Sequence, residues 1–223
     1  MIRKKSVTLP DPLEHLVKIQ ADSVVLEGAL GIPSKTEGIV LFAHGSGSSR
    51  RSPRNNFVAL ILRQKGLATL LMDLLTEEED RDYEMRFNID LLTLRLEAAT
   101  RWLMKQPETR NLGIGYFGAS TGAAAALKSA AVLGPTIEAV VSRGGRPDLA
   151  LGVLDRVQSP TLLIVGSLDE GVIELNKEAG EQLKTEKQLV LIPGATHLFE
   201  EPGALEQVAD LAAAWFQRYL HRR

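Results

Sequence analysis

The sequence predicts an α/β protein: a mostly parallel, twisted sheet of about eight strands with helices on both faces. From about residue 38 to the end, short apolar runs alternate with segments of helical periodicity. Several of these runs are apolar at almost every position, as strands buried on both faces are. Two earlier runs flank a two-residue turn, and we expect them to form an antiparallel pair at one edge of the sheet.

The first half of the chain supplies this edge pair and the first buried strands. Asp22-Ser23 suits the tight turn of the pair. Gly66 suits a helix end, because glycine tolerates the left-handed conformation that closes many helices. The stretch 77–86 is polar and acidic. The expected elements are strands 16–19, 24–30 and 38–43, a helix near 56–64, strand 67–72 and a helix at 89–105.

The second half continues the alternation and contains no linker, repeat or low-complexity segment, so we expect one domain over residues 1–223. Between its first helix and the strand at 161 there is room for one strand and one short helix, which excludes a large cap domain. We expect the closing helix to pack on the sheet, with a dimer face as the alternative. The expected strands are 112–117, 137–142, 161–165 and 189–192, and the expected helices are 121–133, 148–155, 172–183 and 204–220.

Composition excludes several classes of protein. The net charge of −2 and the lack of a basic stripe argue against a nucleic-acid partner. No run of about 18 apolar residues exists to span a membrane. The basic start at residues 1–5 precedes no apolar core, so we expect no export signal. With no cysteine, the chain has no thiol nucleophile and no disulfide, which fits a cytoplasmic enzyme.

The most informative motif is Gly-Ala-Ser-Thr-Gly at residues 118–122. It lies between an expected strand and an alanine-rich helix, where serine hydrolases place their nucleophile on a sharp turn. Gly118 and Gly122 suit this turn, because strand and helix approach too closely there for Cβ atoms. Ser120 is therefore the expected nucleophile.

Two further groups follow later strands in the order that suits this nucleophile. Asp169 ends Gly-Ser-Leu-Asp after the strand at 161–165, and His197 ends Gly-Ala-Thr-His after the strand at 189–192. His-Gly-Ser-Gly-Ser follows the strand that ends at residue 43. Because parallel strands gather their carboxyl ends at one edge, we expect these groups to meet. The order Ser, Asp, His is that of α/β-hydrolases.

With these motifs the chain resembles the α/β-hydrolase fold over nearly its whole length, and most closely the dienelactone-hydrolase-like group. It is also similar to hydrolase domains joined to phosphoribosyltransferases, although no residues remain here for that second domain and no phosphoribosyl-binding motif is present. Dienelactone hydrolases typically use a cysteine nucleophile. The serine at position 120 therefore argues against dienelactone as the substrate.

Each site residue has an expected role. Ser120 attacks an acyl carbon, His197 carries the proton, and Asp169 orients the imidazole. The resemblance implies that the backbone N–H groups of Ser46 and Thr121 bind the oxyanion. It also implies that the remaining motif residues, His44, Gly45, Gly118 and Gly122, shape the elbow and the loop.

Each of these roles has a structural alternative. Asp169 could cap the following helix, with Glu170 as the rival acid. His197 could be a loop residue that caps the next helix. His44 is the second candidate base, although a histidine that shapes the oxyanion loop through its own hydrogen bonds is the favoured interpretation.

Two other patterns are weaker. The glycines of Gly-Ile-Gly-Tyr-Phe-Gly at 113–118 match a dinucleotide fingerprint, with Glu138 at a suitable distance, but they fall inside a strand rather than after one. The acidic run 76–82 is expected to be a solvated loop rather than a metal site. No metal or organic cofactor is implied.

Five arginines follow strand ends and could bind an acidic ester or lactone: Arg50, Arg51, Arg54, Arg143 and Arg146. The interpretation we favour is that they pair with the acidic loop at 77–82 and hold the fold.

The sequence thus predicts a serine esterase for small carboxylic esters, with short acyl chains favoured because no lid is inserted. The alternatives are a thioesterase or acyltransferase, a lactone hydrolase, or a non-catalytic ligand-binding member of the fold.

Overall fold

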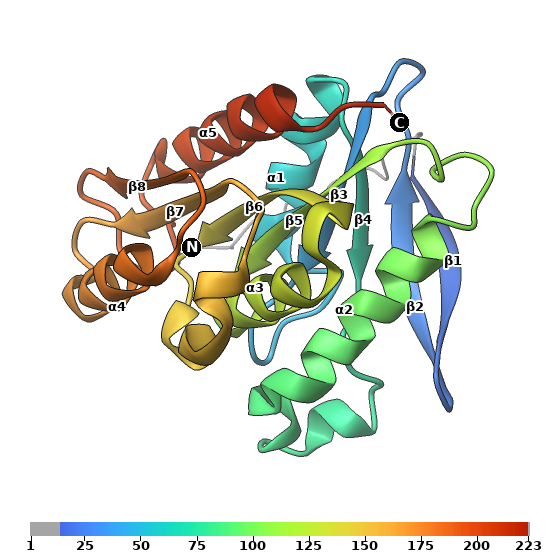
Figure 1. Cartoon of the computed structure of the whole chain (residues 1–223), viewed down its shortest axis with the longest axis horizontal. Coiled ribbons are helices and arrows are strands. Elements are labelled where there is room, and N and C mark those ends of the chain that lie inside the picture. The colour runs from blue at the N-terminus through green and yellow to red at the C-terminus, as the bar shows by residue number, and fades with distance from the viewer. Residues whose placement is uncertain (1–13, 223) are drawn as a thin grey trace, which may run out of the picture.

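The computed structural model describes residues 14–222, and its eight strands form one sheet in the order β1-β2-β4-β3-β5-β6-β7-β8 (Figure 1). The basic start on which the expectation of no export signal depends lies outside the described residues. The strands are β1 Glu14–Ala21, β2 Val24–Gly31, β3 Gly38–Ala43, β4 Ala68–Met72, β5 Gly113–Ala119, β6 Ile137–Arg143, β7 Thr161–Gly166 and β8 Lys187–Ile192.

One strand, β2, runs against all the others. It pairs antiparallel with β1 on one side and with β4 on the other, whereas β4, β3, β5, β6, β7 and β8 pair in parallel. The turn from β1 to β2 places Asp22 at φ 52°, a left-handed conformation that aspartate tolerates better than most residues. The predicted mostly parallel sheet with an antiparallel amino-terminal edge is confirmed.

Helices cover both faces of the sheet (Figure 1). Side chains of α1 and α5 pack on one face, and side chains of α2, α3 and α4 pack on the other. The two sets of strand side chains alternate: Leu41 and Tyr116 face one layer, and Phe42 and Phe117 face the other, with the two phenylalanine rings 4.9 Å apart. The helices are α1 Pro53–Gln64, α2 Ile89–Leu103, α3 Thr121–Leu133, α4 Glu170–Gln182 and α5 Ala204–Tyr219.

Helix α1 differs from the sequence-based expectation in where it starts, and the short helix after β6 differs in type. Helix α1 begins at Pro53, three residues earlier than expected, because the Ser52 hydroxyl accepts from Asn55 N–H and caps it. The short helix expected at 148–155 is a 3₁₀ helix, η4, over Pro147–Arg156. Shorter 3₁₀ turns occur at η1 Glu79–Arg81, η2 Met85–Phe87 and η3 Gly134–Thr136.

The glycines of the fingerprint-like motif belong to packing inside the sheet. Gly113 and Gly115 lie within β5, and a Cβ on Gly115 would lie 2.7 Å from the Phe216 ring of α5. Gly115 therefore admits the close approach of α5, and neither glycine forms a phosphate-binding turn. Within residues 14–222 no helix combines the length and apolar character that crossing a bilayer requires.

Candidate active site

Ser120 lies in a strained turn between β5 and α3. Its backbone has φ 51° and ψ −122°, a region that non-glycine residues rarely occupy. Its carbonyl oxygen accepts from Ala123 N–H at 3.0 Å and from Arg146 N–H at 3.1 Å, and its own N–H donates to Arg143 O at 3.3 Å. These bonds hold the strained backbone in place, and the side chain is half-buried rather than sealed in the core.

The glycines around Ser120 are required by close backbone contacts. A Cβ on Gly118 would lie 2.8 Å from Ala123 N, and one on Gly122 would lie 2.5 Å from His44 O. A Cβ on Gly45 would lie 3.0 Å from Ser120 Cβ. Strand β5, helix α3 and the loop after β3 therefore meet at the elbow with no room for side chains.

Asp169 and His197 are directly bonded. Asp169 Oδ2 lies 2.6 Å from His197 Nδ1, and the aspartate and histidine side chains are 18% and 39% exposed. Asp169 stands at the amino terminus of α4 but makes no side-chain capping bond there. The aspartate carboxylate is thus directed at the imidazole, and the neighbouring acid Glu170 is exposed on the first turn of α4.

The loops that carry these two residues are tied to one another. Gly194 N–H donates to Ser167 Oγ at 2.8 Å, and Leu168 N–H donates to Ala195 O at 3.0 Å. The other side of the histidine faces the loop after β6, where a Cβ on Gly144 would lie 3.5 Å from His197 Cε1. That loop also bonds the Ser120 backbone, so the turn of Ser120 and the loop of His197 both contact the segment 143–146.

His44 uses both ring nitrogens within its own loop. Its Nε2 accepts from Leu74 N–H at 3.0 Å, so the proton lies on Nδ1, which donates to Gly45 O at 3.0 Å. Burial lowers the pKa of His44 below its usual value, which favours this neutral form. The ring therefore anchors the loop after β3 to the segment after β4 and is not free to act as a base.

The two expected oxyanion donors differ in their hydrogen bonding. Thr121 N–H, at the first position of α3, bonds no group among the described residues and lies at the positive end of the helix dipole. Ser46 N–H donates to Thr121 Oγ1 at 2.9 Å. The expected pair of backbone donors did not include this bond to a side chain.

The arginines are distributed differently from the favoured interpretation, which is wrong about their partners. Arg50 pairs with Asp73 and Glu27, Arg54 with Glu200, and Arg146 with Asp148, while the stretch 77–82 pairs instead with Arg86 and Arg95. The reason is the β2–β4 pairing, which brings carboxylates of β2 and of the segment after β4 to the loop of Arg50.

Arg143 differs from Arg50, Arg54 and Arg146, because it is 6% exposed and no carboxylate pairs with it within the described part of the chain. Its guanidinium donates to Asn55 Oδ1 at 3.3 Å and lies 5.6 Å from the centroid of the Phe199 ring. Burial and the nearby Arg54 lower the pKa of Arg143 to about 10.

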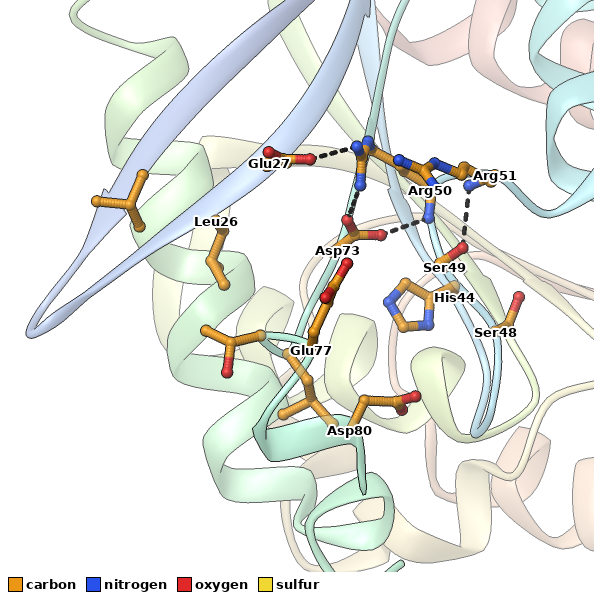
Figure 2. Close-up of a pocket in the computed structure, with 13 residues that line it drawn as sticks. Leu26, Glu27, His44, Ser48, Ser49, Arg50, Arg51, Asp73, Glu77 and Asp80 are labelled. Carbon is orange, nitrogen blue, oxygen red and sulfur yellow. Dashed lines mark hydrogen bonds and ion pairs between the residues drawn. The ribbon is translucent and has the colours of Figure 1, made fainter. Parts of the chain in front are cut away.

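A pocket of about 320 Å³ lies beside the loop after β3 (Figure 2). Glu27, Asp73 and Arg50 line it where the guanidinium bridges the two carboxylates, and the His44 ring and Asp80 also line it. Neither Ser120 nor His197 lines it. Within residues 14–222 no group of three or more His, Asp or Glu side chains is placed to hold a metal ion.

Sequence reasoning missed Asn176, a fully buried residue of α4. Its Nδ2 donates to Gly145 O at 3.1 Å and so holds the loop that contacts both Ser120 and His197. Polar residues inside an amphipathic helix carry no sequence signal of such a contact.

Comparisons with known proteins agree with this geometry. The model of the Dienelactone hydrolase family matches residues 27–221. Two curated Mycobacterium tuberculosis proteins, from strains H37Rv and CDC 1551, are each 56% identical over 211 residues. The match covers 95% of this chain but 48% of each relative, so the chain spans about half the length of these proteins, which carry the provisional name phosphoribosyl transferase.

Solved structures resemble the chain over nearly all of its length. A dienelactone hydrolase from Anabaena variabilis is 58% identical, with a TM-score of 0.92 over 93% of this chain and 98% of that one. Est1E from Butyrivibrio proteoclasticus is 18% identical, with a TM-score of 0.78 over 91% of this chain and 98% of that one, a likeness of fold alone.

Proposed function

The chain belongs to the dienelactone hydrolase family, and we propose that it is a serine hydrolase that cleaves small carboxylic esters through an acyl-serine intermediate. Its family identifies it as a hydrolase. The observation that carries the finer proposal is the 2.6 Å bond between Asp169 and His197. The loop of His197 packs against the segment 143–146, which also bonds the strained backbone of Ser120.

In the proposed mechanism Ser120 Oγ attacks the acyl carbon while its proton passes to His197 Nε2. Asp169 holds the other ring nitrogen and stabilises the imidazolium. The tetrahedral intermediate collapses by breaking the bond to the alcohol oxygen, which takes the proton from His197. Water then attacks the acyl-serine with His197 as base, and the acid leaves as Ser120 regains its proton.

The preference for short acyl chains is inferred from how little of the chain covers the site. Between α3 and β7 the chain forms only the turn η3, the strand β6 and the ten-residue helix η4. No inserted cap stands over the elbow within the described residues, so no apolar tunnel encloses a long chain.

Among the alternatives, a thioesterase, an acyltransferase and a lactone hydrolase would use the same three residues, and comparing thioesters and lactones with oxygen esters separates them.

The proposed function requires a small-molecule ester as the partner and involves neither a nucleic acid nor a membrane. A cytoplasmic location is proposed from the cysteine-free composition. We do not propose phosphoribosyl transfer for this chain, because the match covers 48% of the length of each relative that carries that name.

The test is hydrolysis of p-nitrophenyl esters from acetate to laurate by the wild-type protein and by Ser120→Ala. We expect turnover to be fastest with acetate or butyrate, and to fall in the variant by up to about 10⁶-fold, as removal of a triad serine does elsewhere. Faster turnover of laurate would refute the short-chain proposal, and full activity of the variant would refute the serine mechanism.

A further inference from the structure

The side chain of Thr121 accepts a hydrogen bond from Ser46 N–H, which is one of the two expected oxyanion donors. Ser46 N–H donates to Thr121 Oγ1 at 2.9 Å, across 75 positions of sequence. An N–H in such a bond points at the hydroxyl oxygen and is not aimed at a substrate. The hydroxyl of Thr121 therefore joins the loop after β3 to the first residue of α3.

The same hydroxyl has donor capacity to spare. A threonine hydroxyl accepts through its oxygen and also donates one O–H. Thr121 Oγ1 accepts from Ser46 N–H, while its O–H donates to no group among residues 14–222. Thr121 is 2% exposed, so this O–H lies in a site where an unmatched donor is costly. A substrate oxygen would supply the missing acceptor.

The surrounding backbone brings this residue beside the expected nucleophile. Thr121 directly follows Ser120, and its free N–H lies at the start of α3. Gly45, next to Ser46, approaches the nucleophile so closely that a Cβ there would lie 3.0 Å from Ser120 Cβ. The Ser46 amide, the Thr121 hydroxyl and the Ser120 side chain thus converge from two loops.

We propose that the Thr121 hydroxyl is a catalytic oxyanion donor: it accepts from Ser46 N–H and donates its own O–H to the developing oxyanion, beside Thr121 N–H. The proposal rests on the ester hydrolysis proposed above. As charge grows on the substrate oxygen, the O–H bond to it becomes charge-assisted, and the Ser46 amide polarises the hydroxyl. No proton is transferred and no covalent bond changes in this relay.

The test compares Thr121→Val with Thr121→Ser. Valine keeps the shape, removes the O–H and releases Ser46 N–H, whereas serine keeps the donor. We expect kcat for a short ester to fall about tenfold to a thousandfold in Thr121→Val, with little change in KM, and to be largely retained in Thr121→Ser. If Thr121→Val keeps or exceeds the wild-type kcat, the released Ser46 amide acts directly and the proposal is overturned.

A second variant and a binding measurement guard against a folding artefact. Thr121→Ala removes the same donor without adding bulk, and thermal unfolding identifies the folded variants. Phenylboronic acid, which forms a tetrahedral adduct with an active serine, should inhibit Thr121→Val and Thr121→Ala more weakly than Thr121→Ser. Equal inhibition of all three would contradict the relay. Wild-type activity that requires Ser120 but not the Thr121 hydroxyl would refute this inference alone, whereas an inactive wild type would refute the proposed function.

Discussion

Replacing Asp169 with asparagine should slow ester hydrolysis without unfolding the protein. The aspartate Oδ2 lies 2.6 Å from His197 Nδ1 and makes no helix-capping bond, so its carboxylate has one principal task in the structure. Asparagine keeps the shape, but it removes the charge that stabilises the imidazolium and can present an N–H to the ring nitrogen. The same exchange in a serine protease costs about 10⁴-fold in kcat.

The loss here should be smaller, because the aspartate and histidine side chains are 18% and 39% exposed and water can partly replace the carboxylate. We therefore expect a fall of about a thousandfold in kcat, which corresponds to about 4 kcal/mol. The assay is p-nitrophenyl acetate hydrolysis, and Glu170→Gln is the matched control because Glu170 is the adjacent, exposed acid. An unchanged kcat in Asp169→Asn, or an equal fall in Glu170→Gln, would refute the assignment of the acid.

Three further changes test the architecture. Gly122→Ala places a Cβ 2.5 Å from His44 O and should lower the free energy of unfolding by about 2–3 kcal/mol, or Tm by roughly 5–10 °C. Gly171 has open space around it, so Gly171→Ala should not lower Tm, and equal Tm values for the two variants would contradict the packing argument. Tyr116→Phe removes a buried hydroxyl that bonds two other hydroxyls and should cost about 1–2 kcal/mol in urea unfolding at unchanged kcat, so an unchanged midpoint would count against the network. Because burial lowers the pKa of His44, the unfolded chain binds more protons than the folded protein as pH falls through about 6.5, and stability declines toward acid. His44→Gln should therefore flatten the fall in Tm between pH 7 and 5. An unaltered slope would argue against a neutral His44.

The fold was predictable because its signals are local. Buried parallel strands are apolar at nearly every position, as 38–43 is, and glycines and caps mark the ends of the helices between them. The positions of Ser120, Asp169 and His197 after three different strands follow from the same alternation. The bond between Asp169 and His197 agrees with the expected pairing of acid and base, whereas their catalytic roles stay predictions.

The contacts that the sequence did not reveal are those between distant segments. The partners of Arg50 depend on β2 lying beside β4, an order that alternation alone does not determine. The bond from Ser46 to Thr121 likewise joins a loop to a helix start through one hydroxyl. The interval 148–155 has a helical pattern in sequence, but the backbone closes as a 3₁₀ helix, which periodicity does not distinguish from an α-helix over so few residues.

The most direct test of the account is covalent labelling with a serine-reactive fluorophosphonate, read by intact mass and peptide mapping. We expect one phosphonyl adduct on Ser120 in the wild-type protein, none in Ser120→Ala and slow labelling of Asp169→Asn, because an unactivated serine does not react. A wild-type protein that stays unlabelled, or an adduct on another residue, would contradict the claim that Ser120 is an activated nucleophile.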